Sequence, residues 1–431
     1  MDSPLKTRKI GEGITFSSVT DKRFKTNRLS IHFITELKKD TVTVNALIPQ
    51  VLKKGFKGCE NFTLLNQRLQ DLYGAYVEGD IQKRGDDQIM TLCITAIDDK
   101  FALNQEPVTA RAADILCGMA LHPLIEESGF NEKYVKLEKN ALIDTIQAEM
   151  NEKRSYAINA MTAAMCEGEP YGLPKYGFED AVGQITPRSA KEQYDDLIRS
   201  ARIEVMFTGC GDGESAFAVF QDAFRNVERQ YHPLPKITPH AVPAAGEAVR
   251  RKTEHMSVNQ SKMVLGFGTG TGAGEETVPA NRLMAAVLGG TPSSKLFVNV
   301  REKLSLCYYC AARYDTYKGL LIIDSGVENQ NIEKAEKEIL AQLDAVRQGD
   351  FTEEEYTSAL LSLKNAYSGV YESDSTIESF YLGQLLTGQD SSPEQEKEKL
   401  DRLTREDVIA AADCVRLDTL YLLTGKEEQN G

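Results

Sequence analysis

The sequence lacks the charge and the apolar runs that several common classes of protein require. Its 50 Lys+Arg residues stand against 64 Asp+Glu, which gives a net charge of −14. No excess of positive charge is therefore present to bind nucleic acid or an anionic membrane surface. No apolar run is long enough to span a bilayer, and the N-terminal MDSPLKTRKI lacks the apolar core of a signal peptide. We expect a cytoplasmic protein without nucleic-acid or membrane partners.

Histidine is also scarce, and its five copies show no spacing typical of metal ligands. Two imidazoles share an ion most readily when they lie four residues apart on one face of a helix. The histidines stand instead at widely separated positions: His32, His122, His232, His240 and His255. The sequence predicts that each is structural or on the surface, and that this chain holds no metal or other cofactor.

The eight cysteines are scattered through apparently regular segments, which favours reduced, packed thiols over a disulfide framework. Only the pair in Cys307-Tyr-Tyr-Cys310 is closely spaced. If this segment is a strand, residues three apart point to opposite faces, so the two sulfurs are not expected to share a disulfide or a metal. A redox or metal-binding role for the pair stays open as the alternative.

One order of predicted elements occurs twice in the 431 residues. In each half a strand is followed by two helices and then by a pair of strands. The first copy comprises residues 28–35, 41–52, 62–72, 75–82 and 88–97, with Pro49 in or near the first turn of its first helix and a hairpin turn at 84–86. The second copy comprises residues 262–268, 279–288, 293–304, 306–315 and 320–327.

A repeat of half the chain length indicates an internal duplication, because solenoid repeats are only about 20 to 50 residues long. We therefore predict an N-terminal domain over residues 1–230 and a homologous C-terminal domain over 248–431. Residues 231–247 between them are rich in proline, as in an extended linker. Hairpins followed by runs of helix predict an α+β fold, with an antiparallel sheet and helices packed on one side in each domain.

The segment from Leu296 to Tyr309 predicts a corner at which an amphipathic helix turns into a strand near Ser305. Arg301 and Tyr308 lie on either side of it. An arginine offers a permanently charged fork of donors, and a tyrosine hydroxyl can donate to a carbonyl or an oxyanion. Together they suit the binding of a peptide backbone. The alternative is a surface arginine paired with a nearby carboxylate and a half-buried tyrosine.

Four short segments carry a resemblance to a known family: Leu-Tyr-Gly-Ala at 72–75, Pro-Tyr-Gly-Leu-Pro at 170–174, Arg-Glu-Lys at 301–303, and Cys-Tyr at 307–308. In their order across a duplicated α+β unit, the chain resembles the pitrilysin and insulinase superfamily of zinc peptidases (the inverzincins), which includes the mitochondrial processing peptidase. The resemblance covers nearly the whole chain. It implies that the two domains form one half of a clamshell.

Active members of that family carry the zinc motif H-x-x-E-H on a helix of the first domain. The resemblance places this motif on residues 46–50, where Ala46 and Gln50 replace the histidines and Pro49 replaces the glutamate. The family's further pattern, two carboxylates seven residues apart on a long helix, falls on Glu138 and Thr145. One carboxylate is kept and the other is lost. The resemblance thus implies a degenerate zinc site and a member that is inactive alone.

In two-subunit members of the family, one chain holds the zinc and the other supplies the arginine and tyrosine. This chain resembles the second kind, because Arg301 and Tyr308 are present while the motif is absent. The implied function is that of the non-catalytic, substrate-binding subunit of a heterodimeric zinc endopeptidase, whose zinc lies in a paralogous partner with the motif. A catalytically inactive scaffold or peptide-binding protein is the alternative. A stand-alone peptidase with an unfamiliar metal site is disfavoured, since histidines are not clustered.

Overall fold

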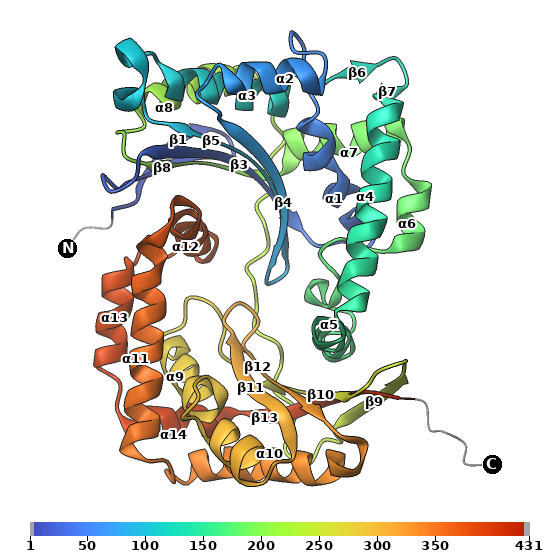
Figure 1. Ribbon diagram of the computed structural model, residues 1–431, viewed down its shortest axis with the longest axis vertical. Coiled ribbons are helices and arrows are strands. Elements are labelled where there is room, and N and C mark those ends of the chain that lie inside the picture. Colours follow the sequence, from blue (N-terminus) through green and yellow to red (C-terminus); the bar gives the residue numbers. More distant parts are fainter. Residues whose placement is uncertain (1–3, 426–431) are drawn as a thin grey trace. The chain divides into compact units, whose positions relative to one another are not determined.

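The computed structural model describes residues 4–425 (Figure 1). These residues form two compact units that are not two contiguous halves of the chain. The first unit contains the described residues up to Gln147, together with Leu173–Lys236 and Val370–Leu386. The second contains Ala148–Gly172, Ile237–Gly369 and the described residues from Thr387 onward. The two units therefore differ from the predicted domains 1–230 and 248–431 chiefly in two segments, 148–172 and 370–386.

The first unit is built on a six-stranded sheet in the order β1-β2-β8-β3-β5-β4. Its strands are β1 (Lys6–Gly11), β2 (Ile14–Thr20), β3 (Thr26–Glu36), β4 (Tyr76–Arg84), β5 (Asp87–Ile97) and β8 (Arg202–Gly209). The strands β2 and β8 run parallel, and all other neighbours are antiparallel. The predicted hairpin is confirmed: Arg84 pairs with Asp87 across a two-residue turn in which Gly85 adopts a φ of +57°. The strand β4 lies at the edge of the sheet.

Helices cover one face of this sheet through a large apolar cluster that includes Phe33, Leu47, Leu92 and Leu116. The N-terminal half of the sequence contributes to this unit the helices α1 (Val42–Leu52), α2 (Phe62–Gln70), α3 (Val108–Leu121), α4 (Glu132–Asn151), α6 (Glu179–Gln184), α7 (Pro187–Ser200) and α8 (Glu214–Phe224). It also contributes short 3₁₀ helices at Asp99–Phe101 and Leu103–Gln105, and a two-stranded ribbon of β6 (Ile125–Glu126) and β7 (Gly129–Phe130). Pro49 was predicted near the start of its helix, and this is wrong. It lies in the last turn of α1.

The second unit repeats the plan with a five-stranded sheet in the order β11-β12-β10-β13-β9. Its strands are β9 (Arg250–His255), β10 (Ser261–Gly268), β11 (Cys307–Asp315), β12 (Leu320–Val327) and β13 (Arg416–Thr424), of which β9 and β13 are parallel. Its helices are α9 (Val278–Gly289), the π-helix η4 (Leu296–Lys303), α10 (Ile332–Arg347), α11 (Glu353–Gly369), α13 (Pro393–Asp401) and α14 (Arg405–Cys414), with 3₁₀ turns at Pro170–Gly172, Asn329–Asn331 and Val370–Glu372 (the last assigned to the first unit). The described residues between α8 and β9 form no helix or strand.

Each half of the sequence contributes one helix to the unit formed mainly by the other half. The helix α5 (Lys153–Met165) packs on the second unit's sheet, where Met161 and Met165 contact Val264 and Tyr421. Gly266 of β10 permits this contact, because a Cβ there would lie 2.4 Å from the Met161 sulfur. The helix α12 (Asp374–Thr387) packs in the same way on the first unit's sheet. Helices therefore lie on both faces of each sheet, and the prediction of one covered side is wrong in this detail.

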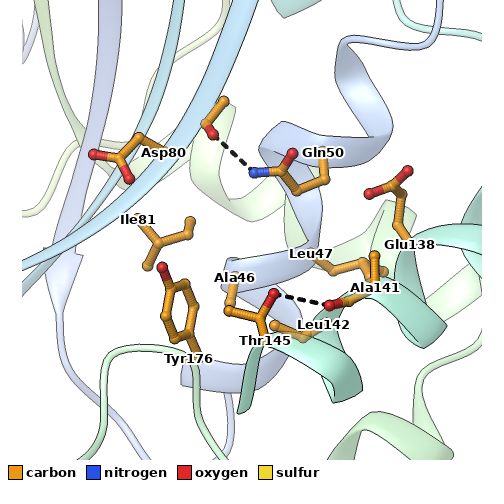
Figure 2. Close-up of a pocket in the computed structure, with 11 residues that line it drawn as sticks. Ala46, Leu47, Gln50, Asp80, Ile81, Glu138, Ala141, Leu142, Thr145 and Tyr176 are labelled. Atoms are coloured by element: carbon orange, nitrogen blue, oxygen red, sulfur yellow. Dashed lines mark hydrogen bonds between the residues drawn. The ribbon is translucent and has the colours of Figure 1, made fainter. Parts of the chain in front are cut away.

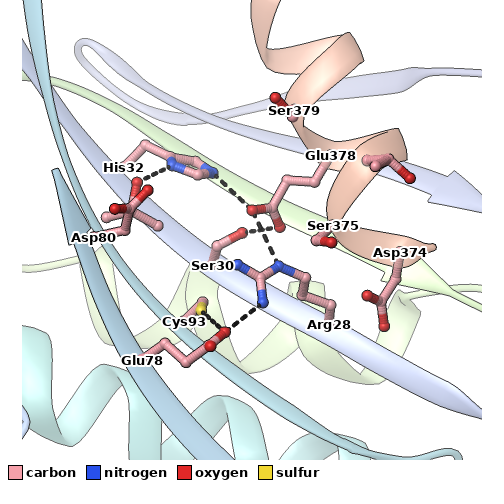
Figure 3. A network of polar contacts seen from close by, with 12 residues as sticks. Arg28, Ser30, His32, Glu78, Asp80, Cys93, Asp374, Ser375, Glu378 and Ser379 are labelled. Carbon is pink, nitrogen blue, oxygen red and sulfur yellow. Dashed lines mark hydrogen bonds and ion pairs between the residues drawn. The ribbon is translucent and has the colours of Figure 1, made fainter. Parts of the chain in front are cut away.

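The face of β3 that α12 covers carries polar side chains, which form a buried network (Figure 3). The Arg28 guanidinium donates to Glu378 of α12 at 3.2 Å and to Glu78 of β4 at 3.0 Å. Ser30 also donates to the Glu378 carboxylate. Burial raises the pKa of Glu378, against the opposing effect of Arg28. The alternating polar residues of this strand thus face a buried partner helix and not solvent.

His32 lies beside this network and is buried. Its Nδ1 lies 2.8 Å from the Thr91 hydroxyl, and its Nε2 lies 3.7 Å from Glu378. The Glu378 carboxylate already accepts from an arginine and a serine, so it offers little further stabilisation to an imidazolium. Burial lowers the pKa of His32 to about 3, with added repulsion from Arg84 and Arg28. The ring is therefore neutral at physiological pH.

The predicted fold class is confirmed, since the chain forms two α+β units, each with one sheet and packed helices. The sheets are antiparallel apart from one parallel pair in each. These parallel pairs arise because β8 and β13, the last strands of their halves, enter the sheets beside strands that precede the repeated segments.

Candidate functional site

A pocket of about 180 Å³ lies within the first unit between α1, α4 and the edge strand β4 (Figure 2). Four of the five positions assigned to the degenerate zinc site line it: Ala46 and Gln50 from α1, and Glu138 and Thr145 from α4. Pro49 does not line it but packs against Gly79 of β4 from the same helix. One turn of α1 separates Ala46 from Gln50, and two turns of α4 separate Glu138 from Thr145, so each pair shares a helical face.

Each polar replacement in the pocket is hydrogen-bonded within the unit. The Gln50 amide donates to the Gly79 carbonyl at 2.9 Å, which fastens α1 to the edge strand. The Thr145 hydroxyl donates to the Ala141 carbonyl at 2.8 Å, one turn earlier in its own helix. Neither group is directed toward a shared metal position.

The one retained carboxylate has a cationic partner in the chain itself. Lys54, just beyond α1, places its Nζ 2.6 Å from Glu138 Oε1, and both side chains are largely buried. The same ammonium lies 5.6 Å from the centre of the Phe62 ring. A lysine charge thus neutralises the carboxylate that would otherwise face a metal cation. The lining contains no histidine or cysteine, and its two carboxylates are Asp80 of β4 and the ion-paired Glu138, so the pocket's residues do not fit a zinc ion.

Arg301 and Tyr308 belong to the second unit, on either side of the predicted corner. Arg301 lies in η4 and its guanidinium stacks over the Phe297 ring at 4.5 Å. Its ion-pair partner among the described residues is Glu302, at 3.6 Å. Tyr308, the second residue of β11, has 63% of its surface exposed, and its hydroxyl donates to the Glu328 carboxylate at 3.3 Å. Both side chains therefore present polar groups to the surface of their unit.

The backbone at this corner differs from the predicted amphipathic α-helix. The segment winds as a π-helix, in which Leu304 N–H donates to Asn299, and Ser305 turns the chain with a φ of +50°. In this wider helix Leu296 and Val300 are buried, whereas Leu304, which α-helical spacing would place on the same face, is half exposed. Such π-helical segments are rare and are frequent at functional sites.

A β-bulge overturns the expectation that Cys307 and Cys310 point to opposite faces. In the pairing of β11 with β12, Cys307 lies opposite Val327 and Tyr309 opposite Gly326, so Tyr308 is the extra residue. Both cysteines consequently face the same apolar cluster and are buried. A hydrogen bond from the Cys310 thiol lowers the pKa of Cys307 to about 7. The bulge also explains how Tyr308 comes to project outward from the start of a strand.

Comparisons with known proteins agree with this architecture. Residues 184–363 match the protein family described as "Peptidase M16 inactive domain". Over 421 residues, 96% of each chain, the sequence is 30% identical to the "Probable inactive metalloprotease YmfF" of Bacillus subtilis (strain 168). The chain belongs to the M16 peptidase family. This confirms the resemblance to the inverzincin zinc peptidases. The sequence of this M16 member contains no H-x-x-E-H motif.

Solved structures share the fold of this M16 chain at lower sequence identity. A conserved protein from Enterococcus faecalis V583 superposes with a TM-score of 0.92 at 23% identity, covering 99% of this chain and 100% of that one. A chain from complex III2 of Candida albicans superposes with a TM-score of 0.74 at 14% identity, covering 97% and 95%. At these identities the likeness shows the fold alone. Among residues 4–425, no helix is both long and apolar enough to cross a membrane.

Two features of the M16 chain were not predicted from the sequence. Lys54 was not among the predicted site residues, although a lysine four residues beyond the second lost histidine was the available signal for a replaced metal charge. His240 was expected, from the spacing of the histidines, to be structural or on the surface. The structure places it beside Cys166 and Glu169, from segments more than 70 residues away in sequence.

Proposed function

We propose that the chain is the non-catalytic, substrate-binding subunit of a heterodimeric zinc endopeptidase. In this assembly a paralogous partner with the H-x-x-E-H motif holds the zinc. Arg301 binds carbonyl oxygens of the peptide substrate, and the Tyr308 hydroxyl donates to the scissile carbonyl or its oxyanion. The cysteines of the described chain are all free, which fits the reducing cytoplasm as the site of the assembly.

The observation that carries this proposal is the contrast between the two sets of family residues. The zinc positions are replaced, and an internal lysine neutralises the remaining carboxylate, Glu138. Arg301 and Tyr308, in contrast, keep polar groups at the surface of a corner fixed by a π-helix and a bulge. A solvent-exposed tyrosine held on a bulged strand has little to contribute to the stability of its own unit. Its placement is accounted for if its hydroxyl has a partner outside the chain.

The test is the activity of the assembled pair. The chain is co-expressed with a paralogue that contains H-x-x-E-H, and turnover of a peptide mixture is measured with and without a chelator. Tyr308→Phe is expected to lower kcat at least tenfold without separating the subunits, because removal of one oxyanion donor costs about 3 to 4 kcal/mol in other enzymes. Tyr134→Phe, on α4 of the first unit, is the matched control and should leave kcat unchanged. Unaltered turnover in Tyr308→Phe would remove the role assigned to the tyrosine.

A second candidate, a peptide-binding scaffold without catalysis, is favoured by the pocket beside β4. This strand ends the first unit's sheet, so one side of its backbone lacks a strand partner, and three of its residues line the pocket. An extended peptide could add to such an edge and place a side chain in the pocket. Glu138 in its ion pair would then line a peptide subsite and not a metal site.

The scaffold function predicts peptide binding by the isolated chain. Fluorescence polarisation with labelled peptides would detect it. Ala141→Phe narrows the pocket from an exposed position of α4 and should weaken binding, whereas Leu137→Phe, on the same helix but outside the pocket, should not. Binding that is indifferent to Ala141→Phe would place the peptide elsewhere.

A further inference from the structure

Three side chains with different metal-binding atoms lie close together in the second unit. The M16 pocket, in contrast, lies in the first unit. Cys166 caps the C-terminus of α5, Glu169 follows it in the next turn, and His240 comes from the extended segment before β9. One ligand atom from each, the Sγ, a carboxylate oxygen and a ring nitrogen, lies within 4.8 Å of the other two. Cys166 and His240 are buried, and Glu169 is partly exposed. The group is therefore enclosed but reachable from solvent on one side.

The imidazole of His240 is oriented so that one nitrogen faces the other two groups. Its Nδ1 lies 2.5 Å from Glu169 Oε1 and 3.9 Å from the Cys166 sulfur. Its Nε2 lies 3.4 Å from the Asp418 carboxylate, and its backbone N–H donates to the Lys318 carbonyl at 2.8 Å. A histidine that binds a metal through one nitrogen commonly donates its other ring N–H to a carboxylate, which fixes both the tautomer and the ring plane. His240 has this arrangement.

The charges around the group leave one oxygen of Glu169 available. Lys318, itself almost fully buried, lies 2.8 Å from Oε2, the oxygen that faces away from the imidazole contact. The Asp418 carboxylate in turn lies 2.9 Å from the Arg250 guanidinium. Each of the two carboxylates beside His240 therefore has a cationic partner of its own.

A carboxylate only accepts hydrogen bonds, so the 2.5 Å contact between Glu169 and His240 Nδ1 needs a proton on that nitrogen. A metal ion would take the place of this proton and of the thiol proton of Cys166. In a tetrahedral zinc site, Zn–N of about 2.0 Å and Zn–S of about 2.3 Å set the N···S separation at about 3.5 Å. The present separation is 3.9 Å. To hold the ion, the Cys166 sulfur and Nδ1 must approach each other by about 0.4 Å, and the partly exposed Glu169 carboxylate must withdraw by about 1 Å.

We propose that Cys166, Glu169 and His240 form a zinc site, with a water molecule as the fourth ligand. Binding of Zn²⁺ displaces the thiol proton of Cys166 and breaks the contact between Nδ1 and Glu169, while Nε2–H of the imidazole donates to Asp418. The site joins the segment 148–172, which the N-terminal half contributes to this unit, to the chain that leads into β9. Its role is structural, and it does not depend on the peptidase function proposed above.

The test uses the full-length protein after dialysis against a chelator. Titration with Co²⁺, which reports on ligands through its spectrum, is expected to show one tetrahedral ion per chain with a thiolate-to-cobalt charge-transfer band, and one equivalent of Zn²⁺ should abolish that band. Cys166→Ser should remove the band, and Asp418→Asn should weaken binding by about 10- to 100-fold. Cys414→Ser, which alters the exposed cysteine, is the matched control and should retain both the charge-transfer band and the wild-type affinity.

Two further readouts keep the proposal falsifiable if a variant folds poorly. Zinc should raise the Tm of the wild-type protein, and an unbuffered titration should show proton release as the Cys166 thiolate forms. An octahedral cobalt spectrum without the thiolate band in the wild type would overturn the proposal. So would a band that survives in Cys166→Ser. Neither result would bear on the activity of the Tyr308→Phe pair, so the two proposals can fail separately.

Discussion

Replacement of Lys54 by methionine tests whether an internal cation has taken over the electrostatic role of a metal in the M16 pocket. The change keeps most of the side-chain volume but removes the ammonium that lies 2.6 Å from the Glu138 carboxylate. Only 6% of the surface of Glu138 is exposed. Removal of one partner from a buried ion pair typically costs about 3 to 5 kcal/mol. At about 2 to 4 °C per kcal/mol for a unit of this size, the Tm of the first unit should fall by about 6 to 20 °C. Urea unfolding measures the change in the free energy of unfolding and thermal unfolding measures the Tm, both followed by circular dichroism.

A double-mutant cycle separates the ion pair from the loss of packing around the lysine stem. Lys54→Met combined with Glu138→Gln should recover most of the lost stability, because a neutral amide replaces the uncompensated carboxylate. The matched surface pair is Lys364 with Asp401, at 2.7 Å and half exposed, and Lys364→Met should cost less than about 1 kcal/mol. If Lys54→Met also cost less than about 1 kcal/mol, solvent would be screening Glu138, and the lysine could not be described as a substitute for the metal.

Three further predictions follow from the pocket and from the network under α12. The double variant Ala46→His and Gln50→His places two imidazoles one turn apart, and dialysis should show zinc bound beyond the wild-type stoichiometry only when Lys54→Met is added, since the ammonium repels the ion. Glu378→Gln leaves the Arg28 guanidinium without its buried carboxylate and should destabilise the first unit by about 3 to 5 kcal/mol in urea. The folded-state pKa of His32, about 3, lies below its unfolded value of about 6.5, so the unfolded chain binds more protons between these values. Stability should therefore fall by up to about 1.4 kcal/mol per pH unit below pH 6.5, and a weaker slope is expected in His32→Gln.

The sequence predicted much of the fold because its patterns are local. Strand and helix periodicity, together with the repeated order of elements, indicated two homologous α+β units, and the turn at Gly85 was identified from its residues. The exchange of α5 and α12 was not predictable in this way. An apolar helical face indicates that a helix packs on something, but it does not indicate which of two sheets it packs on. The polar positions of β3, Arg28, Ser30 and His32, were compatible with solvent until α12 was found over them.

The candidate site was predictable to the extent that it depends on helical spacing. Counting along two helices brought Ala46, Gln50, Glu138 and Thr145 to one pocket, because seven residues return a helix to the same face. Features that depend on contacts between distant segments were missed. A bulge adds one residue to a strand and reverses the face of every residue beyond it, which is why Cys307 and Cys310 were assigned to opposite sides.

The zinc-site positions and the Arg301–Tyr308 pair therefore differ in how firmly the surrounding residues hold their polar groups. In the zinc pocket, each replacement has acquired a partner within the unit: Gln50 with β4, Thr145 with its own helix, and Glu138 with Lys54. Restoring a metal there would require those contacts to be broken as well as ligands to be added. At the corner, the polar partners that residues 4–425 offer Arg301 and Tyr308 are exposed carboxylates, at 3.6 and 3.3 Å, and these can be exchanged for a ligand at little cost. This contrast between a closed metal pocket and an available corner is what supports our proposal of a substrate-binding subunit whose partner carries out the cleavage.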